Sequence, residues 1–362
     1  MSQAPTPEPT VVCAPVWSDV QRESDFNAWL TALAPIHQLD LSSLRIASAD
    51  ASFRRYLRID SAAGSLIIMD APPDKEDCRP FAKVAQLMQD AQLLAPQVMA
   101  WDEAHGFMLL TDLGAQTMMQ VMDPDRAVAN QRLYLQAVDA LIAWQLASRP
   151  DVLPPYDEAL LHRELSLFPD WYLARHRGVT LEGDDRRTLD DAFKLIIEHN
   201  LAWPSVYVHR DFMPRNLMIS GDPAEKRLGV LDFQDAVYGP ITYDIASLMR
   251  DAFLSWDEDF CLDITIRYWD KARKAGLPVG DDFGEFYKGV EWMGLQRHLK
   301  VAGIFARLTL RDGKPQYLAD TPRFIHYIRS TCARYMQLKP LLRLIERLEG
   351  IEVPSGYSFG KI

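Results

Sequence analysis

The feature that most constrains the fold is a change in hydrophobic pattern between residues 113 and 120. Before this point, short apolar runs are separated by turns rich in Gly, Pro and Asp, as is typical of β-strands. After it, apolar residues recur every three or four positions over long stretches, as is typical of amphipathic helices. The chain is therefore predicted to have an α+β fold with a small β-rich lobe followed by a larger helical lobe.

The elements expected in the β-rich part are helices at Ser24–Leu33 and Arg79–Leu94 and strands at Leu44–Ala47, Arg55–Ile59, Ser65–Met69, Val98–Asp102 and Phe107–Thr111. Those expected in the second part are helices at Ala127–Ala147, Glu158–His176 and Thr188–Asn200, a short strand at Val206–Val208, a β-hairpin, and helices from there to about Gly350. The predicted domains are a flexible Pro- and Thr-rich tail (1–18), a β-rich lobe (19–112) and a helical lobe (113–362).

Charge and composition exclude some classes of protein. The formal net charge of −11 disfavours nonspecific binding to nucleic acid and docking on anionic lipid. The sequence contains no run of 18 apolar residues, so we predict no membrane span. The four cysteines show no metal-site spacing. We expect a cytoplasmic protein without an obligatory protein partner.

The segment richest in chemistry runs from His209 to Phe233. Leu217–Ser220 and Leu228–Leu231 are predicted to form the two arms of a β-hairpin. Antiparallel pairing would return Asn216, just before the first arm, and Asp232, just after the second, to the same end of the hairpin. Mg²⁺ prefers oxygen ligands of this kind, together with water and substrate phosphates. Asp211 lies on the loop just ahead of this predicted metal site.

These residues carry a resemblance to a known family. His209-x-Asp211-x-x-x-x-Asn216 is similar to the catalytic loop of kinases, and Leu231-Asp232-Phe233 resembles the kinase D-F-G motif. Gln234 replaces the Gly of that motif, and this makes the segment resemble the aminoglycoside phosphotransferase and choline kinase-like family. Strings at 50–56, 69–73 and 164–168 are similar to a bacterial subgroup, the anomeric N-acetylmuramate/N-acetylglucosamine kinases of cell-wall recycling.

The resemblance implies a bilobal protein-kinase-like fold, with the β-rich lobe binding the nucleotide and the helical lobe holding the catalytic loop and the substrate site. It also implies ATP-dependent phosphorylation of an amino sugar, most simply at its anomeric hydroxyl, in peptidoglycan recycling. Asp211 would accept the proton of that hydroxyl, and Asn216 and Asp232 would hold Mg²⁺. His209 and Asp244 would have structural roles in the loop.

The nucleotide end departs from the kinase pattern. Met69 stands where kinases have a strand lysine, and Gln86 where they have its glutamate partner. An arginine of the first loop is expected to contact the phosphates instead, Arg54 before Arg55, with Lys75 as the next choice. The full set of predicted nucleotide-binding residues is Ser52, Phe53, Arg54, Thr111 and Leu113.

The predicted substrate residues are Glu164, Trp171 and Arg297. A carboxylate ahead of an aromatic side chain suits a sugar, and residues 291–330 carry seven Lys/Arg against three acids. This local positive excess favours a neutral or anionic sugar over a cationic antibiotic. The alternatives are a kinase for choline, homoserine or an aminoglycoside, and a nucleotide-binding pseudokinase, which the missing lysine favours.

Overall fold

The computed structural model describes residues 15–17, 19–49, 53–123, 126–222 and 224–351. The chain divides into two compact units. The first comprises Met1–Val121 together with Leu217–Asp235, and the second comprises Met122–Asn216 together with Ala236–Ile362. This division differs from the predicted boundary at residue 112, because the hairpin joins the β-rich unit.

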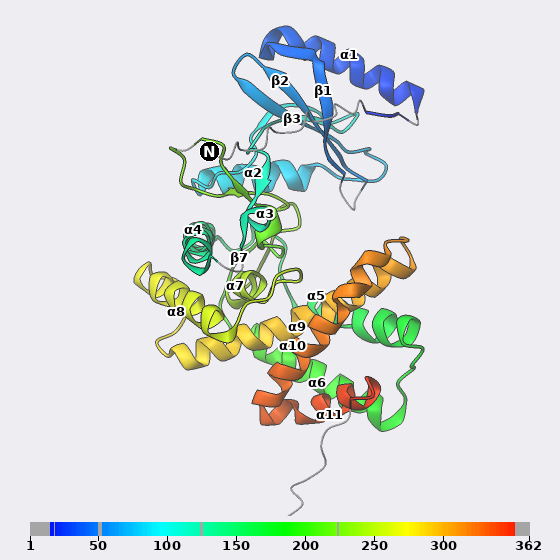
Figure 1. Cartoon of the computed structure of the whole chain (residues 1–362), viewed down its shortest axis with the longest axis vertical. Coiled ribbons are helices and arrows are strands. Elements are labelled where there is room, and N and C mark those ends of the chain that lie inside the picture. The colour runs from blue at the N-terminus through cyan, green and yellow to red at the C-terminus, as the bar shows by residue number, and fades with distance from the viewer. Residues whose placement is uncertain (1–14, 18, 50–52, 124–125, 223, 352–362) are drawn as a thin grey trace, which may run out of the picture. The chain divides into compact units, whose positions relative to one another are not determined.

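The first unit is built on a five-stranded antiparallel sheet with the strand order β1-β2-β3-β5-β4 (Figure 1). The strands are β1 (Leu39–Ala49), β2 (Arg55–Ser61), β3 (Gly64–Asp70), β4 (Val98–Asp102) and β5 (Phe107–Thr111). The turn between β4 and β5 requires glycine: Gly106 has φ +72°, and a Cβ there would lie 1.9 Å from the carbonyl oxygen of Ala71.

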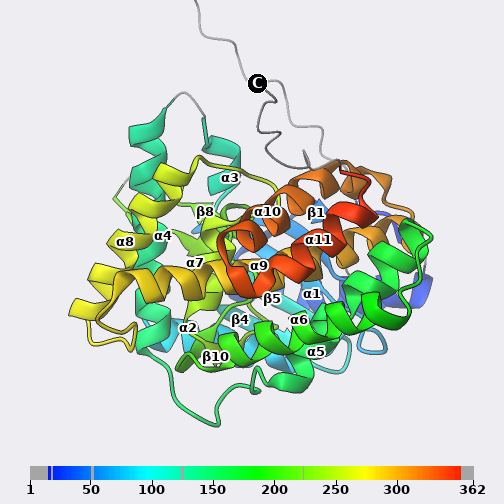
Figure 2. The same ribbon diagram turned by 90° about the horizontal axis from the view of Figure 1, so that it is seen from below.

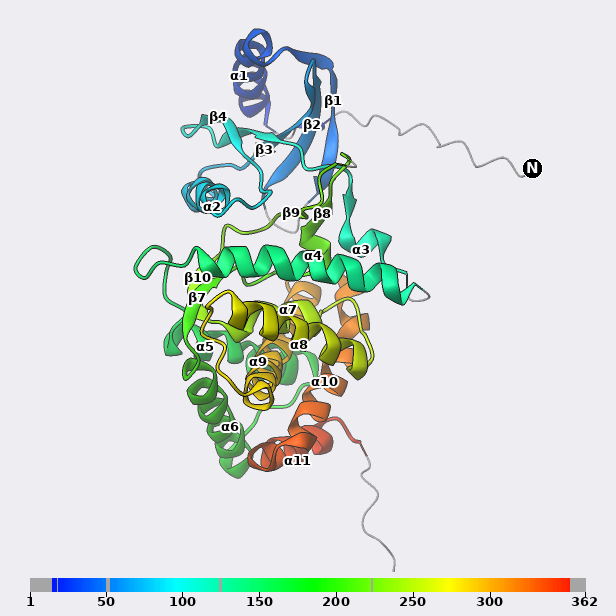
Figure 3. The same cartoon turned by 90° about the vertical axis from the view of Figure 1, so that its left-hand side faces the viewer.

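Helix α1 (Val20–His37) packs on one face of this sheet, as Figure 3 shows. Burial of its apolar residues Phe26 and Leu30 against the sheet anchors the helix. The core they form also contains Leu39, Leu57, Ile59, Ile68, Phe107 and Leu109. The helix is longer at both ends than the predicted Ser24–Leu33, and its N-cap is Asp19, which accepts from the amides of Gln21 and Arg22.

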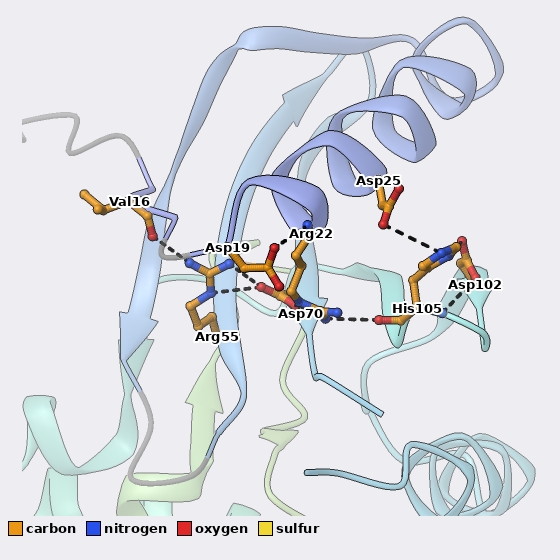
Figure 4. A network of polar contacts seen from close by, with 8 residues as sticks. All are labelled: Val16, Asp19, Arg22, Asp25, Arg55, Asp70, Asp102 and His105. Atoms are coloured by element: carbon orange, nitrogen blue, oxygen red, sulfur yellow. Dashed lines mark hydrogen bonds and ion pairs between the residues drawn. The ribbon is translucent and has the colours of Figure 1, made fainter. Parts of the chain in front are cut away.

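A buried carboxylate joins α1 to the sheet (Figure 4). The Nε of Arg22, on α1, donates to Asp70 Oδ1 at 2.9 Å, and the Nε of Arg55, on β2, donates to Oδ2 at 2.9 Å. Arg55 also donates to the carbonyl of Val16 and lies over the Trp17 ring, 4.0 Å from its centroid. These contacts hold residues 16 and 17 of the predicted flexible tail against the sheet. Residues 1–14 and 18 of that tail lie outside the described residues.

The hairpin belongs to the first unit because it pairs there. Strand β8 (Leu217–Ile219) lies between β6 (Gln116–Thr117) and β9 (Gly229–Val230). Leu217 pairs with Val230 in an antiparallel hairpin, as predicted. The amide of Val230 also donates to the carbonyl of Leu94 at 2.8 Å. Two further helices of this unit are α2 (Arg79–Asp90) and α3 (Met118–Val121).

The second unit is helical around α9 (Phe283–Leu310), which contacts α5, α6, α7, α8 and α10 (Figure 2). Its other elements are α4 (Ala127–Leu146), α5 (Glu158–Leu165), η1 (Phe168–His176), α6 (Gly183–Leu201), β7 (Ser205–Val208), η2 (Pro214–Asn216), β10 (Val237–Pro240), α7 (Thr242–Met249), α8 (Glu258–Lys274), η3 (Pro315–Asp320), α10 (Thr321–Arg334), η4 (Met336–Leu338) and α11 (Lys339–Leu348). Strands β7 and β10 pair antiparallel.

The single helix predicted over Glu158–His176 is instead two. Helix α5 ends at Leu165, and η1 begins at Phe168 with the wider π-type turn, in which the amide of Arg177 donates to the carbonyl of Tyr172. The junction packs closely on α9: a Cβ on Gly303 would lie 2.3 Å from the carbonyl oxygen of Leu167. Within the described residues, no helix has the length and apolar character needed to cross a membrane.

Candidate active site

The loop that follows β7 is held by a buried carboxylate from α7. Asp244 Oδ2 accepts from the amide of His209 at 2.7 Å, and Oδ1 accepts from the amide of Arg210 at 3.0 Å. Burial raises the pKa of Asp244 to about 7, and these two N–H groups oppose the rise. Asp244 therefore fixes the backbone just ahead of Asp211.

Hydrogen bonds inside the loop link the predicted base to the predicted metal ligand. The amide of Asp211 donates to Nδ1 of the buried His209 at 3.3 Å, and Nδ2 of Asn216 donates to the carbonyl of Asp211 at 2.9 Å. The Asp211 side chain is half-buried. The loop thus holds both residues in one hydrogen-bonded turn, and a half-buried carboxylate can still receive a proton from a substrate hydroxyl.

The predicted carboxylate ligand, Asp232, follows β9 in the first unit. Its neighbour Phe233 is fully buried and packs on Phe81 with ring centroids 4.9 Å apart, whereas Asp232 is exposed and accepts from Nε2 of Gln234 at 2.8 Å. Asp232 has φ +65°, a left-handed conformation that is uncommon for residues other than glycine. Burial of Phe233 beside this bend anchors the position of the carboxylate in its own unit.

Each of the two predicted ligands is of a kind that Mg²⁺ accepts. Asn216 uses its amide nitrogen within the loop, so its oxygen is the end suited to a cation, and Asp232 supplies a carboxylate. The described residues contain no group of three or more His, Cys, Asp or Glu side chains suited to a metal. Mg²⁺ commonly binds through one or two protein oxygens, with water and phosphate completing its shell.

The arginine expected to replace the missing lysine is buried and paired. Arg54 is 8% exposed, and its Nη2 lies 3.0 Å from Glu76 Oε2, in the loop before α2. Neighbouring Phe53 is 65% exposed, and Ser52 lies outside the described residues. Lys75 is exposed beside Asp74. Glu76 was not singled out in the sequence, because no local pattern joins it to a residue 22 positions away.

Strand alternation separates Arg54 from Arg55. Arg55 pairs in register with Asp70 on the face covered by α1, so it is directed away from Met69, which shares the opposite face with Tyr56 and Met108. Arg55 is therefore engaged by Asp70 on the face of the sheet that α1 covers. Met69 is fully buried, and Gln86 is exposed and bonded within its own helix to Asp90, so these two residues form no pair.

The segment after β5, predicted to bind the nucleotide base, is fixed by an ion pair that the sequence did not reveal. Arg58 Nε donates to Asp112 Oδ2 at 2.6 Å, and Arg58 Nη2 donates to the carbonyl of Gly114 at 2.9 Å. Thr111 Oγ1 accepts from the amide of Gln97 at 2.9 Å. Leu113 packs on Gly229: a Cβ added to Gly229 would lie 2.9 Å from the Cδ1 of Leu113.

Glu164, predicted to accept a sugar hydroxyl, is 4% exposed and has protein partners at both oxygens. Arg210 Nη2 and Lys300 Nζ lie 2.5 and 2.9 Å from Oε1, and Tyr156 Oη and Gln296 Nε2 donate to Oε2 at 2.5 and 3.0 Å. Burial alone would raise the pKa of Glu164, but the two cations and the hydrogen bonds bring it to about 2. These contacts favour a role in holding the loop over contact with a sugar.

Arg297 is also internal. It is 3% exposed, and its Nη1 donates to the carbonyl of Arg210 at 2.6 Å and to Tyr243 Oη at 3.1 Å. Trp171 is half-buried, with the Arg175 guanidinium 4.2 Å from its ring centroid. Nothing in these contacts joins Trp171 to the loop.

The local positive excess is largely neutralised within the chain. Four of its cations pair with carboxylates: Lys300 with Glu164, Arg311 with Asp312, Arg323 with Asp320, and Arg329 with Glu346. The excess counted from the sequence is therefore weak support for an anionic substrate.

Comparison with known proteins places the chain among phosphotransferases. A model of the phosphotransferase enzyme family matches residues 43–280. An N-acetylmuramate/N-acetylglucosamine kinase of Pseudomonas aeruginosa is 48% identical over 338 residues, covering 91% of this chain and 98% of the relative. A kinase of the same name from Neisseria meningitidis is 46% identical over 343 residues, covering 94% of this chain and all of the relative.

Solved structures agree on the fold. A choline/ethanolamine kinase family protein from Mesorhizobium loti has a TM-score of 0.59 at 15% identity, covering 90% of this chain and 99% of the other. An ADP-bound aminoglycoside phosphotransferase has a TM-score of 0.54 at 13% identity, covering 85% and 97%. These likenesses confirm the predicted α+β, protein-kinase-like fold. The chain belongs to the phosphotransferase enzyme family, as its match over residues 43–280 and its close relatives show.

Proposed function

We propose that this chain is an ATP-dependent kinase that phosphorylates N-acetylmuramate and N-acetylglucosamine at the anomeric hydroxyl, in the recycling of peptidoglycan. The observation that carries the proposal is the 46–48% identity, over more than nine-tenths of the chain, to kinases named for these two sugars. We also propose that the reaction takes place in the cytoplasm.

The proposed chemistry rests on three side chains. Asp211 orients the sugar hydroxyl and accepts its proton as the oxygen attacks the γ-phosphate. Asn216 and Asp232 hold Mg²⁺, which when bound neutralises charge on the phosphates. Support comes from the hydrogen bond between Asn216 and the carbonyl of Asp211, and from the exposed carboxylate that follows β9.

At the nucleotide end we propose that Arg54 supplies the positive charge that Met69 cannot. A guanidinium can bind phosphate oxygens in pairs, and the ion pair with Glu76 would hold it in a fixed orientation. Thr111 and Leu113, with Ser52 and Phe53, remain the proposed contacts to the nucleotide. Trp171 remains a proposed contact to the sugar.

A coupled ADP-release assay over N-acetylmuramate, N-acetylglucosamine, choline and kanamycin tests the proposal. We expect release only with the two amino sugars. The methyl glycoside of N-acetylglucosamine, whose anomeric oxygen is blocked, serves as the matched control and should be inert. Equal turnover of the glycoside would contradict anomeric phosphorylation, and turnover of choline or kanamycin alone would contradict the amino-sugar assignment. ATP binding without release for any acceptor would favour the pseudokinase.

A further inference from the structure

The residue just before Asp211 has an unusual backbone. Arg210 has φ +77°, in the left-handed region that side chains other than glycine rarely occupy. Such a conformation is energetically unfavourable and persists only where the surroundings hold it. Because Arg210 and Asp211 share a peptide bond, whatever holds Arg210 also orients the proposed base.

Three helices hold Arg210 by its polar groups. Its amide donates to Asp244, on α7, at 3.0 Å, and its carbonyl accepts from Arg297, on α9, at 2.6 Å. Its guanidinium Nη2 donates to Glu164, on α5, at 2.5 Å. The two backbone contacts define the position of the peptide, and the third adds a charged hydrogen bond at the end of the side chain.

The partner carboxylate is itself held. Lys300 Nζ lies 2.9 Å from the same Glu164 oxygen that Arg210 contacts, and it donates to Tyr243 Oη at 3.1 Å. Gln296 and Lys300 are one turn apart on α9, so a single face of that helix contacts both oxygens of the carboxylate. Glu164 and Lys300 are each less than a tenth exposed, so the pair lies in a low-dielectric interior where its attraction is strong.

We propose that Glu164 and Lys300 are positioning residues of the phosphotransferase: acting through Arg210, they set the orientation of Asp211 and do not contact the sugar. This inference rests on the proposed function, because it takes Asp211 as the base. Glu164, Lys300 and Arg210 are called the loop clamp below.

Glu164→Gln tests the loop clamp, because it keeps the shape of the side chain and removes its charge. We expect kcat to fall by about 10- to 100-fold, the effect of a displacement on the order of 1 Å at a reacting group. The KM values for sugar and ATP should stay within about threefold of wild type, because only orientation changes. Lys300→Met should act in the same direction but more weakly, because Arg210 still pairs with Glu164.

The matched control is Glu291→Gln. Glu291 is also buried, also lies in the second unit, and also pairs with an arginine and a tyrosine, Arg334 and Tyr335. Both variants should lose thermal stability, but only Glu164→Gln should lose kcat. A selective rise in the sugar KM would instead make Glu164 a substrate contact. An equal loss of kcat in both variants would reduce the loop clamp to general stability. Either result overturns the proposal.

A double-mutant cycle separates action through Arg210 from independent action. If Glu164 acts through the arginine, Glu164→Gln and Arg210→Gln together should lower kcat about as much as either alone. Additive losses would overturn the proposal. Should Glu164→Gln fail to fold, Tyr156→Phe removes only one hydrogen bond to the carboxylate; a milder fall in kcat at unchanged KM is expected, and an unchanged kcat counts against the loop clamp.

Hydrogen exchange keeps this inference separate from the proposed function. In Glu164→Gln, the amides of His209 and Arg210 should exchange faster than in wild type and in Glu291→Gln, whatever the enzyme phosphorylates. Absence of ADP release from the wild type with either amino sugar would refute the proposed function alone. If the wild type is active but these amides exchange no faster in Glu164→Gln than in wild type, the loop clamp alone is refuted.

Discussion

At the scale of single residues, two residues of the proposed active site have a left-handed backbone conformation although neither is glycine. Arg210 precedes the proposed base, and Asp232 is the proposed metal ligand itself. Each is held by neighbours that are buried: Asp244 and Glu164 contact Arg210, and Phe233 fills a core next to Asp232. Strained backbone of this kind clusters at functional sites, where the surroundings hold it in place.

Asp232→Ala should weaken Mg²⁺-dependent nucleotide binding as well as the rate, because a metal ligand acts on the nucleotide before any transfer. Calorimetric titration of the variant with ATP, with and without Mg²⁺, measures the effect. Asp222→Ala is the control, since Asp222 is exposed on the turn of the same hairpin. An unchanged affinity for MgATP and an unchanged Mg²⁺ dependence would remove Asp232 from the metal site.

Arg54→Ala should raise the KM for ATP and lower kcat together, with the sugar KM little changed, because the proposed role of this charge is at the nucleotide phosphates alone. Steady-state kinetics with ATP and sugar varied in turn measures both constants. Lys75→Ala, an exposed neighbour, should be mild. Glu76→Gln should resemble Arg54→Ala in direction, since Glu76 orients the guanidinium. Wild-type kinetics in Arg54→Ala would end the compensation hypothesis.

At the scale of elements, ion pairs between different elements hold the helices in place. Local sequence predicts where a helix lies along the chain but not these pairs. Strands β4 and β5 match their predicted bounds, because turn residues delimit them on both sides. Strands β6 and β10 were not predicted, since two to four residues carry no readable alternation. Ion pairs such as Arg54 with Glu76 and Lys300 with Glu164 were also not predicted. The hydrophobic pattern of a sequence does not specify which charged residues, distant in the chain, pair in the fold.

Asp70→Asn should loosen α1 from the first unit. Asp70 is 1% exposed and accepts from arginines on α1 and β2, so its neutral replacement leaves two cations without their carboxylate. Removing one partner of a buried pair costs about 3 kcal/mol of unfolding free energy. Denaturant unfolding measures it. Asp60→Asn, at an exposed pair with Arg45 on the same sheet, should cost no more than about 1 kcal/mol. Equal losses would contradict the fastening role.

The ion pairs of Glu164 with Arg210 and Lys300 should make the free energy of unfolding depend on pH in the acid range. The pKa of Glu164 is lowered from 4.5 to about 2, so its contribution is complete above about pH 5 and is lost as the pH falls toward 2. The unfolding free-energy difference between wild type and Glu164→Gln should therefore shrink by about 2 kcal/mol between pH 6 and pH 3. A difference that stays constant or grows over this range would show that the carboxylate is not held ionised.

At the scale of the whole molecule, the sequence was enough for the family and the fold but not for the surroundings of buried charges. The spacing from His209 to Asp232 predicted a kinase-like fold, which the family match and the solved structures confirm. Glu164 was predicted to contact a sugar from its position ahead of Trp171, and Arg297 from the local positive excess, and neither pattern separates an inward charge from an outward one. Their burial and their contacts to Arg210 came only from the structure.

The most direct test of the account compares the wild type with Asp211→Asn in one ADP-release assay with N-acetylmuramate or N-acetylglucosamine as acceptor. The wild type should release ADP only when sugar is present. Asp211→Asn should lose at least about 100-fold in kcat, the contribution of a positioned base, and should still bind ATP, because the base acts on the acceptor. A wild type without sugar-dependent release, or a variant that keeps more than about a tenth of wild-type kcat, would contradict the account.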